Sequence, residues 1–320
     1  MRFSVLAAVT AAVLAVQSGA LAQQPPTQST AENTAHNNDE IVVTGERMRS
    51  ILRDFVGDIA APASPRENQL ARWDHRICTG IFGMTNRDQA QYIADRIAQR
   101  AFAIGLEASP SGCRANIVVF VTPDANALSH MLASEYRGLL ALRRNVNVNT
   151  PNMAALDSFT TSTRPVRWWH VSNTYTADGM RVGDPMGGMA SENGALVRVF
   201  DPTRLRRAVR QDFERIIIVV DARQAAGHTL AALSDYLAMV SLAQLAPSIE
   251  TAAYPSVLNL FSQDGSVTGM TTWDLAFLDG LYRAPRTANS AREQEGAIAE
   301  RMNQTLNAAD HAPATAAPRP

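Results

Sequence analysis

The chain has 320 residues, of which 46% are hydrophobic and 18% are charged, and its formal net charge at pH 7 is -1. This length and composition allow one large domain with a sizeable core, and the near-neutral charge gives no electrostatic basis for binding nucleic acid or an anionic membrane surface. Every basic residue is an arginine, so Schiff-base lysine chemistry and lysine-dependent phosphate-binding loops are excluded.

The N-terminus has the pattern of a secretory signal. An apolar run from Val5 to Val16 follows Arg2, and Ala20-Leu21-Ala22 forms a small-residue cleavage site. The run is too short to span a bilayer comfortably, which favours cleavage after Ala22 over a retained transmembrane anchor. We therefore expect residues 1–22 to be a signal peptide and the mature protein to be periplasmic or secreted.

Export determines how the two cysteines are interpreted. In an oxidising compartment, Cys78 and Cys113, which flank a predicted helix, are expected to form a disulfide rather than a metal or redox site. Closing a loop of that size stabilises a fold by about 3 to 4 kcal/mol in the chain-entropy account. The alternatives are two separate buried thiols, or a thiol–imidazole pair between His75 and Cys78.

Residues 23–40 are polar and contain almost nothing apolar, so they are predicted to form a disordered tether. The next segment, 41–50, begins with a β-branched run and is predicted to be a short strand. Residues 39–47, which begin with the sequence DEIVVTG, resemble a segment near the N-terminus of TonB-dependent outer-membrane receptors. That resemblance implies pairing with a periplasmic partner protein through Ile41, Val42, Val43 and Thr44. The alternative is an edge strand of the protein's own sheet.

A single globular domain is expected over 51–285. Its first half alternates between helix and strand signals, with helix caps at Asn86 and Asp124 and a glycine stop at Gly105. The predicted elements are a helix from Asn86 to Ile104, a strand over Asn116–Thr122, and a helix from Pro123-Asp124 toward Leu142.

The second half is expected to continue as a loop or lid over Asn145–Arg164, strands over Val166–Tyr175 and Ala195–Phe200, a helix over Pro202–Glu214, and a central strand over Ile216–Val220. Residues 286–320 are predicted to be a disordered tail. These elements indicate an α+β fold in which a mixed sheet packs with helices.

Residues 227–282 contain an apolar helix, a turn and a second helix, with the sequences GHTLAALSDYLAMVSLAQL, YPSVLNLF and MTTWDLAFLDGLY. In outline this order resembles the C-terminal half of a metzincin-type zinc peptidase. In that family an active-site helix is followed by a methionine-bearing turn under the metal and then by a closing helix. The resemblance implies a metzincin-like helix-turn-helix with a site along its first helix. The alternative is an amphipathic helix pair that packs a core.

The zinc-binding pattern of that family is HExxHxxGxxH, in which histidines four residues apart lie on one helical face. Alanine cannot bind zinc, and serine and glutamine are poor substitutes for imidazole, so we expect no metal and no cofactor. The glutamate position falls on Asp235 and the methionine position on Leu258. The candidate pocket therefore consists of the three former ligand positions and these two residues: Ser234, Ala238, Gln244, Asp235 and Leu258.

No two of the six histidines are four residues apart, and the chain has no GxSxG elbow. His228 precedes the central helix and could approach Asp235, although a capping or solvated histidine is the simpler interpretation. The sequence favours a non-catalytic zinc-peptidase-like binding or envelope-associated module. The alternatives are an active secreted hydrolase whose site comes from distant segments, and a partner of TonB-type envelope machinery.

Overall fold

The computed structural model describes residues 35–64, 68–142, 148–182, 190–191, 194–195, 206–247, 249, 251–262 and 267–310. For 35–44, 190–195 and 310 only the main chain is described. The chain divides into two compact units, 1–44 and 45–320, and each is considered by itself. The predicted signal peptide, 1–22, and most of the predicted tether lie outside the described residues.

A mixed five-stranded sheet forms the centre of the larger unit, with the strand order β1-β2-β7-β4-β3. β1 (Thr79–Phe82), β2 (Ile117–Thr122) and β7 (Val209–Asp221) are parallel to one another. β4 (Val166–Thr176) runs antiparallel to β7 with a bulge between Val171 and Ser172, and β3 (Val148–Asn149) runs antiparallel to β4. The expected α+β class with a mixed sheet is confirmed.

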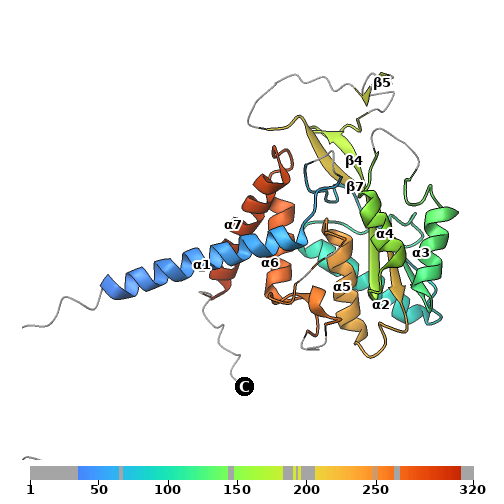
Figure 1. Ribbon diagram of the computed structural model, residues 1–320, viewed down its shortest axis with the longest axis horizontal. Coiled ribbons are helices and arrows are strands. Elements are labelled where there is room, and N and C mark those ends of the chain that lie inside the picture. Colours follow the sequence, from blue (N-terminus) through green and yellow to red (C-terminus); the bar gives the residue numbers. More distant parts are fainter. Residues whose placement is uncertain are drawn as a thin grey trace, which may run out of the picture. The chain divides into compact units, whose positions relative to one another are not determined.

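Helices cover both faces of this sheet (Figure 1). On one face lie α2 (Arg87–Ala103) and α5 (Leu230–Leu242), and on the other lie α3 (Ala125–Ser134) and α4 (Met153–Thr161). Successive residues of one strand belong to different cores, because side chains alternate between the two faces of the sheet. Trp168 packs in the α2/α5 core, whereas Trp169 packs in the α3/α4 core.

Local sequence signals explain the ends of several elements. The Asn86 side chain accepts from the main-chain N–H groups of Asp88 and Gln89 and caps α2, as predicted. Gly105, at φ +84°, follows its C-terminus. Asp124 likewise caps α3, although this helix ends at Ser134 rather than near Leu142. The predicted disulfide is confirmed: Cys78 and Cys113 are bonded, with Cα atoms 6.1 Å apart.

The C-terminal region is helical beyond the predicted end of the domain. After the 3-10 turn η1 (Val257–Asn259), α6 (Thr272–Arg283) begins with a capping box between Thr271 and Asp274. α7 (Ala291–Asp310) then packs against α6 and buries Ile298 and Met302. The prediction of a disordered tail over 286–320 is therefore wrong as far as residue 310. The apolar residues of α7 are sparse, so its helical spacing gives only a weak signal in the sequence.

The predicted strand at 41–50 is also wrong. The structure places these residues in α1 (Ala35–Ile59), whose C-terminal end buries Leu52, Phe55, Val56 and Ile59. That i, i+3, i+4, i+7 spacing stabilises a helix at this end. Extending an existing helix costs less free energy than starting a new one, so the helix continues backwards through the β-branched residues. Addition of residues 41–44 to a partner's sheet would require this part of α1 to unwind.

Two predictions between the strands also fail. The predicted helix over Pro202–Glu214 is wrong for its described residues, 206–214, which lead into β7; this strand extends backwards from Ile216 to Val209. Asn145–Arg164 is not a simple loop, because Asn152 caps α4. The strand expected over Ala195–Phe200 is described only at its start, where β6 (Gly194–Ala195) pairs with β5 (Ala190–Ser191).

Candidate functional site

Asp235 lies on the central helix in a nearly complete shell of donors. α5 begins at its N-cap Thr229, follows the central strand β7, and buries most of its residues. Asp235 itself is 1% exposed. Arg96 donates to it from Nε and Nη2 at 2.7 and 3.0 Å, and Arg100 donates from the same two atoms at 2.8 Å each. Two arginines one turn apart on α2 therefore hold a single carboxylate of α5.

This shell fixes the charge of the carboxylate. Burial alone would raise the pKa of Asp235, but the hydrogen bonds from Arg100 and Arg96 outweigh it and hold the pKa well below its usual range. The hydrogen bond to Asp235 in turn raises the pKa of Arg96. Asp235 is therefore ionised at neutral pH and fully engaged. It is unsuited to act as a general base, which must accept a proton near the working pH.

The loop before α6 completes the shell. The main-chain N–H of Met270 donates to Asp235 Oδ2 at 3.0 Å. A Cβ at Gly269 would lie 2.8 Å from the same oxygen, so only glycine lets the loop approach this closely. Asp274 connects this loop to the turn at η1, because it accepts from the main-chain N–H of Thr271 at 2.9 Å and from Ser256 Oγ at 2.6 Å.

An open cleft of about 540 Å³ lies beside this cluster. The arginine–aspartate cluster forms one wall, and Tyr254, Asn259 and the loop 267–271 form the others. Asp235 is the single carboxylate among the described residues that line the cleft, and it faces two guanidinium groups. Arg100 Nη1 takes no part in the bonds to Asp235, and the main-chain N–H groups of Thr268 and Gly269 make no hydrogen bond within the described chain. The cleft therefore offers positive charge and free donors.

Of the five residues in the predicted pocket, only Asp235 lines this cleft. Ser234 is buried and donates back to the carbonyl of Leu230 at 2.6 Å, and Ala238 is buried in the core. Gln244 is buried with its Nε2 3.4 Å from His170 Nδ1. Leu258 lines a neighbouring cavity of about 340 Å³ instead.

The residues at the three positions where the metzincin pattern has its ligands do not fit a zinc ion. Ser234 is bonded to its own helix, Ala238 has no donor atom, and Gln244 faces a histidine rather than a shared centre. Among the described residues, no group of three or more His, Cys, Asp or Glu side chains is placed to hold a metal. His228 packs edge-on against Phe261, with ring centroids 4.9 Å apart, and does not join Asp235 in the cluster.

Arg96 and Arg100 were not among the predicted site residues, although their spacing contains a usable signal. Residues at i and i+4 share one helical face, and they lie beside the predicted core residues Ile93 and Ile97 of α2. Two arginines beside the buried residues of a helix are expected to bond to an anionic group, because a charge near the core needs a partner. The position of that anion, 135 residues further along the chain at Asp235, is set by tertiary packing alone.

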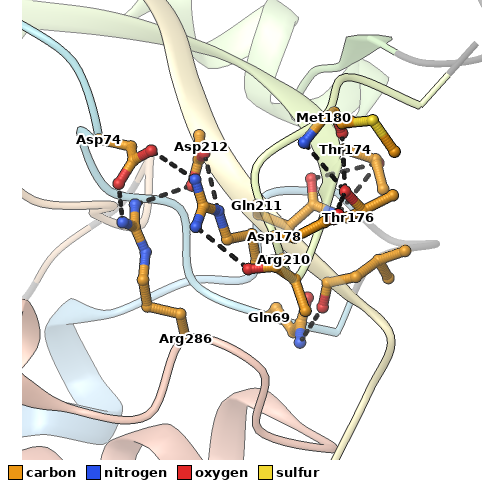
Figure 2. Close-up of polar contacts among 12 residues, drawn as sticks. Gln69, Asp74, Thr174, Thr176, Asp178, Met180, Arg210, Gln211, Asp212 and Arg286 are labelled. Atoms are coloured by element: carbon orange, nitrogen blue, oxygen red, sulfur yellow. Dashed lines mark hydrogen bonds and ion pairs between the residues drawn. The ribbon is translucent and has the colours of Figure 1, made fainter. Parts of the chain in front are cut away.

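A second polar cluster was also missed, and it joins distant segments (Figure 2). Asp74 and Asp212 face Arg210 and Arg286, and each arginine contacts both acids. Asp212 is 1% exposed, and its burial raises its pKa despite both arginines. Gln69 strengthens the junction by donating to the carbonyls of Val209 and Ala288. This cluster connects the segment before β1, strand β7 and the α6–α7 connection, so we assign it a structural role.

Comparisons with protein families, with curated proteins and with solved structures found no match to this chain. In the described part of the chain, no helix is long and apolar enough to cross a membrane. The candidate site consequently rests on its geometry: a polar cleft beside a saturated arginine–aspartate cluster.

Proposed function

We propose that this chain is an exported, non-catalytic binding module related to metzincin-type zinc peptidases, and that its ligand site is the cleft beside Asp235. The disulfide between Cys78 and Cys113 supports the oxidising, periplasmic or secreted location. The order of central strand, buried helix, turn and closing helix supports the relationship.

One observation carries the proposal. The residue at the glutamate position, Asp235, is bonded to both Arg96 and Arg100 and so serves as an anchor of the fold. A peptidase of the resembled type would need this carboxylate free to handle a proton beside a bound metal. The same anchor leaves two guanidinium groups at the wall of an open cleft, which is an arrangement suited to holding a ligand.

The cleft favours a ligand with an anionic group. Its described lining holds two arginines and one carboxylate, and that carboxylate is already saturated. Arg100 Nη1 and the main-chain N–H groups of Thr268 and Gly269, which make no hydrogen bond to the described residues, can donate to an incoming carboxylate or phosphate oxygen. The class includes a peptide whose C-terminal carboxylate enters the cleft while its chain lies along Tyr254 and Asn259.

The proposal is tested on purified protein in two steps. Metal analysis and a general peptidase assay come first, and we expect no stoichiometric zinc and no turnover. Titration then compares two acetylated tripeptides of the same sequence, one with a free C-terminal carboxylate and one amidated, using NMR of backbone amides. We expect the free acid to shift the resonances of 267–271 and the amide to shift them less.

The variant Arg100→Gln should weaken the response to the free acid about tenfold, in line with the loss of one charge-assisted hydrogen bond. Arg283→Gln is the matched control, because Arg283 is an exposed arginine on α6 that pairs with Asp279 outside the cleft. One zinc per chain together with peptide turnover would refute the non-catalytic assignment. Identical responses to the free acid and the amide would refute the choice of anionic ligands.

A further inference from the structure

A second open cleft, of about 560 Å³, lies on the α3/α4 side of the sheet, whereas Asp235 and its arginines lie on the α2/α5 side. Its described lining comes from residues 114–116 and 118 at the start of β2, from the turn at 138–139, and from residues 214–215 of β7. We call it the bulge cleft, because residues 214–215 belong to the β-bulge between β7 and β4. Among the described residues, none lines both clefts, so a ligand here does not depend on the function proposed above.

The bulge sets the direction of Arg215. Arg215 is directly opposite Val171 of β4, and Phe213 is directly opposite Ser172, so Glu214 is the extra residue of the bulge. Val171 packs in the α3/α4 core and Phe213 packs in the α2/α5 core. Directly opposite residues share a face of the sheet, so Arg215 lies on the α3/α4 side, where the cleft is.

The carboxylate of Glu214 lies on the same side. It accepts a hydrogen bond from Asn173 Nδ2. Asn173 comes two residues after Val171 on β4, whose residues alternate regularly here, so both belong to the α3/α4 face. Neighbours along a regular strand point to opposite faces, whereas the bulge lets Glu214 and Arg215 line one cleft together.

Neither charge has a charged partner within the described chain. Arg215 is half-buried and its Nη1 donates to the carbonyl of Leu139, another lining residue, at 2.9 Å. Glu214 is also half-buried, and its one described partner is the neutral amide of Asn173. Arg114, which is exposed at the cleft, makes no hydrogen bond or ion pair with any described residue. The cleft therefore presents both signs of charge, and neither is neutralised.

This pair of charges limits the class of ligand. A purely anionic ligand would be attracted by the arginines and repelled by Glu214, and a purely cationic ligand would meet the reverse. A small zwitterion can satisfy both. The volume of the cleft is in the range of small-molecule sites, and Val118 and Leu139 give part of its lining an apolar character.

We propose that the bulge cleft binds a free α-amino acid with an apolar side chain. The ammonium group of the ligand bonds to Glu214 and its carboxylate bonds to Arg215, so each half-buried charge gains an opposite charge. The side chain of the ligand lies toward Val118 and Leu139.

The test is an NMR titration of the backbone amides of the full protein at pH 7 with L-leucine, N-acetyl-L-leucine and L-leucinamide. Only L-leucine carries both charges, because acetylation removes the ammonium group and amidation removes the carboxylate. We expect L-leucine to shift the resonances of 138–139 and 214–215, and each analogue to bind there about tenfold more weakly, since it lacks one charge-assisted contact. The resonances of 267–271 report separately on the cleft beside Asp235.

Glu214→Gln keeps an acceptor for Asn173 and removes the charge, so it should make L-leucine and N-acetyl-L-leucine bind with equal affinity. The matched control is Glu107→Gln, at an exposed glutamate that pairs with Arg76 and does not line the cleft, and it should keep the preference for L-leucine. If Glu214→Gln does not fold, the three probes on the unmodified protein decide. The proposal would be overturned by no response to L-leucine at 138–139 and 214–215, by an equal response to either analogue in the unmodified protein, or by an unchanged preference in Glu214→Gln.

Discussion

At the scale of single residues, the most consequential group is the carboxylate of Asp235. It is buried, and each of its oxygens receives one hydrogen bond from each of two arginines. Bidentate guanidinium pairs of this kind are stronger and more specific in direction than ordinary hydrogen bonds. The positions of α2 and of the loop before α6 relative to α5 therefore depend on Asp235.

Asp235→Asn keeps the shape of the side chain and removes its charge. We expect the free energy of unfolding to fall by about 3 to 5 kcal/mol, because two partly buried guanidinium groups would be left without their anion. Urea denaturation at pH 7 measures this loss. Asp95→Asn, an exposed aspartate on the same helix α2, is the control and should change stability little. A loss below 1 kcal/mol would contradict the anchoring role.

His170 makes stability depend on pH. It is 2% exposed, its Nε2–H donates to the carbonyl of Val240 at 3.0 Å, and burial lowers its pKa to about 4 despite that bond. The unfolded chain binds this proton near pH 6.5, so between pH 6.5 and 4 the unfolded state holds more protons than the folded one. Stability should therefore fall by about 3 kcal/mol as the pH drops through this window.

Urea unfolding at pH 7 and at pH 4.5 measures the effect. In His170→Gln the free energy of unfolding should differ less between the two pH values. The contribution of Asp235 falls in a separate window. Its pKa is depressed, so its stabilisation is present above about pH 4 and is lost only below that value. An unchanged pH dependence in His170→Gln would show that other groups cause it.

At the scale of elements, tight turns and the disulfide hold the β1 side of the sheet. Gly83 ends β1 at φ +86°, and a Cβ there would lie 2.1 Å from the carbonyl oxygen of Val121. Gly105 ends α2 at φ +84° with nothing within 4 Å of such a Cβ. The two glycines share a left-handed conformation and differ only in the space around them.

Gly105→Ala should cost about 1 kcal/mol, the strain of placing alanine at positive φ. Gly83→Ala should cost clearly more, because β1 must also move away from β2. Paired urea denaturation of the two variants measures the difference. Equal losses would show that the strand end adapts and that conformation alone sets the cost.

Removal of the disulfide tests the same side of the molecule. The double variant Cys78→Ser, Cys113→Ser opens a loop with a sequence separation of 35 residues. We expect it to lower the free energy of unfolding by about 3 to 4 kcal/mol. Thermal unfolding with and without a reducing agent should reproduce the loss in the unmodified protein and leave the double variant unaffected. Two free thiols in the denatured, unreduced protein would contradict the bond.

How far the sequence predicts this fold depends on whether a signal is local. The caps at Asn86 and Asp124 and the strand at Ile216–Val220 were predictable, because side-chain capping and continuous β-branching act within a few residues. The helix prediction fails at 206–214, because polar residues there are buried by partners more than 70 residues away, as Asp212 is by Arg286. The candidate site was predicted only at Asp235, since its arginines and cleft are products of packing.

At the scale of the whole molecule, the C-terminal helices complete the core. α6 and α7 pack together, and Ile298 and Met302 of α7 join the same buried cluster as Leu52 and Phe55 of α1. Arg72 adds to this closure by donating to the carbonyls of Leu281 and Ala284. The last helix is therefore part of the domain.

Deleting residues 291–320 should abolish cooperative unfolding, because the apolar faces of α1 and α6 would lose their cover. A milder test is Ile298→Ala, which should cost about 2 to 5 kcal/mol as a large-to-small change at a fully buried site. Glu300→Ala, at an exposed position of the same helix, is its control. Near-UV circular dichroism and urea denaturation measure both. A deleted chain that still unfolds cooperatively would make α7 dispensable.

The cluster of Asp74, Asp212 and Arg286 also bears on the order in which the chain can fold. Asp74 and Arg286 are 212 residues apart in sequence, yet they share one junction with the central strand. Asp74 becomes available before Arg286 as the chain emerges from its N-terminus, so the junction cannot close until the chain as far as Arg286 is present. Until then the buried Asp212 lacks its second arginine partner. The chain therefore reaches its final folded state only after nearly all of it is present.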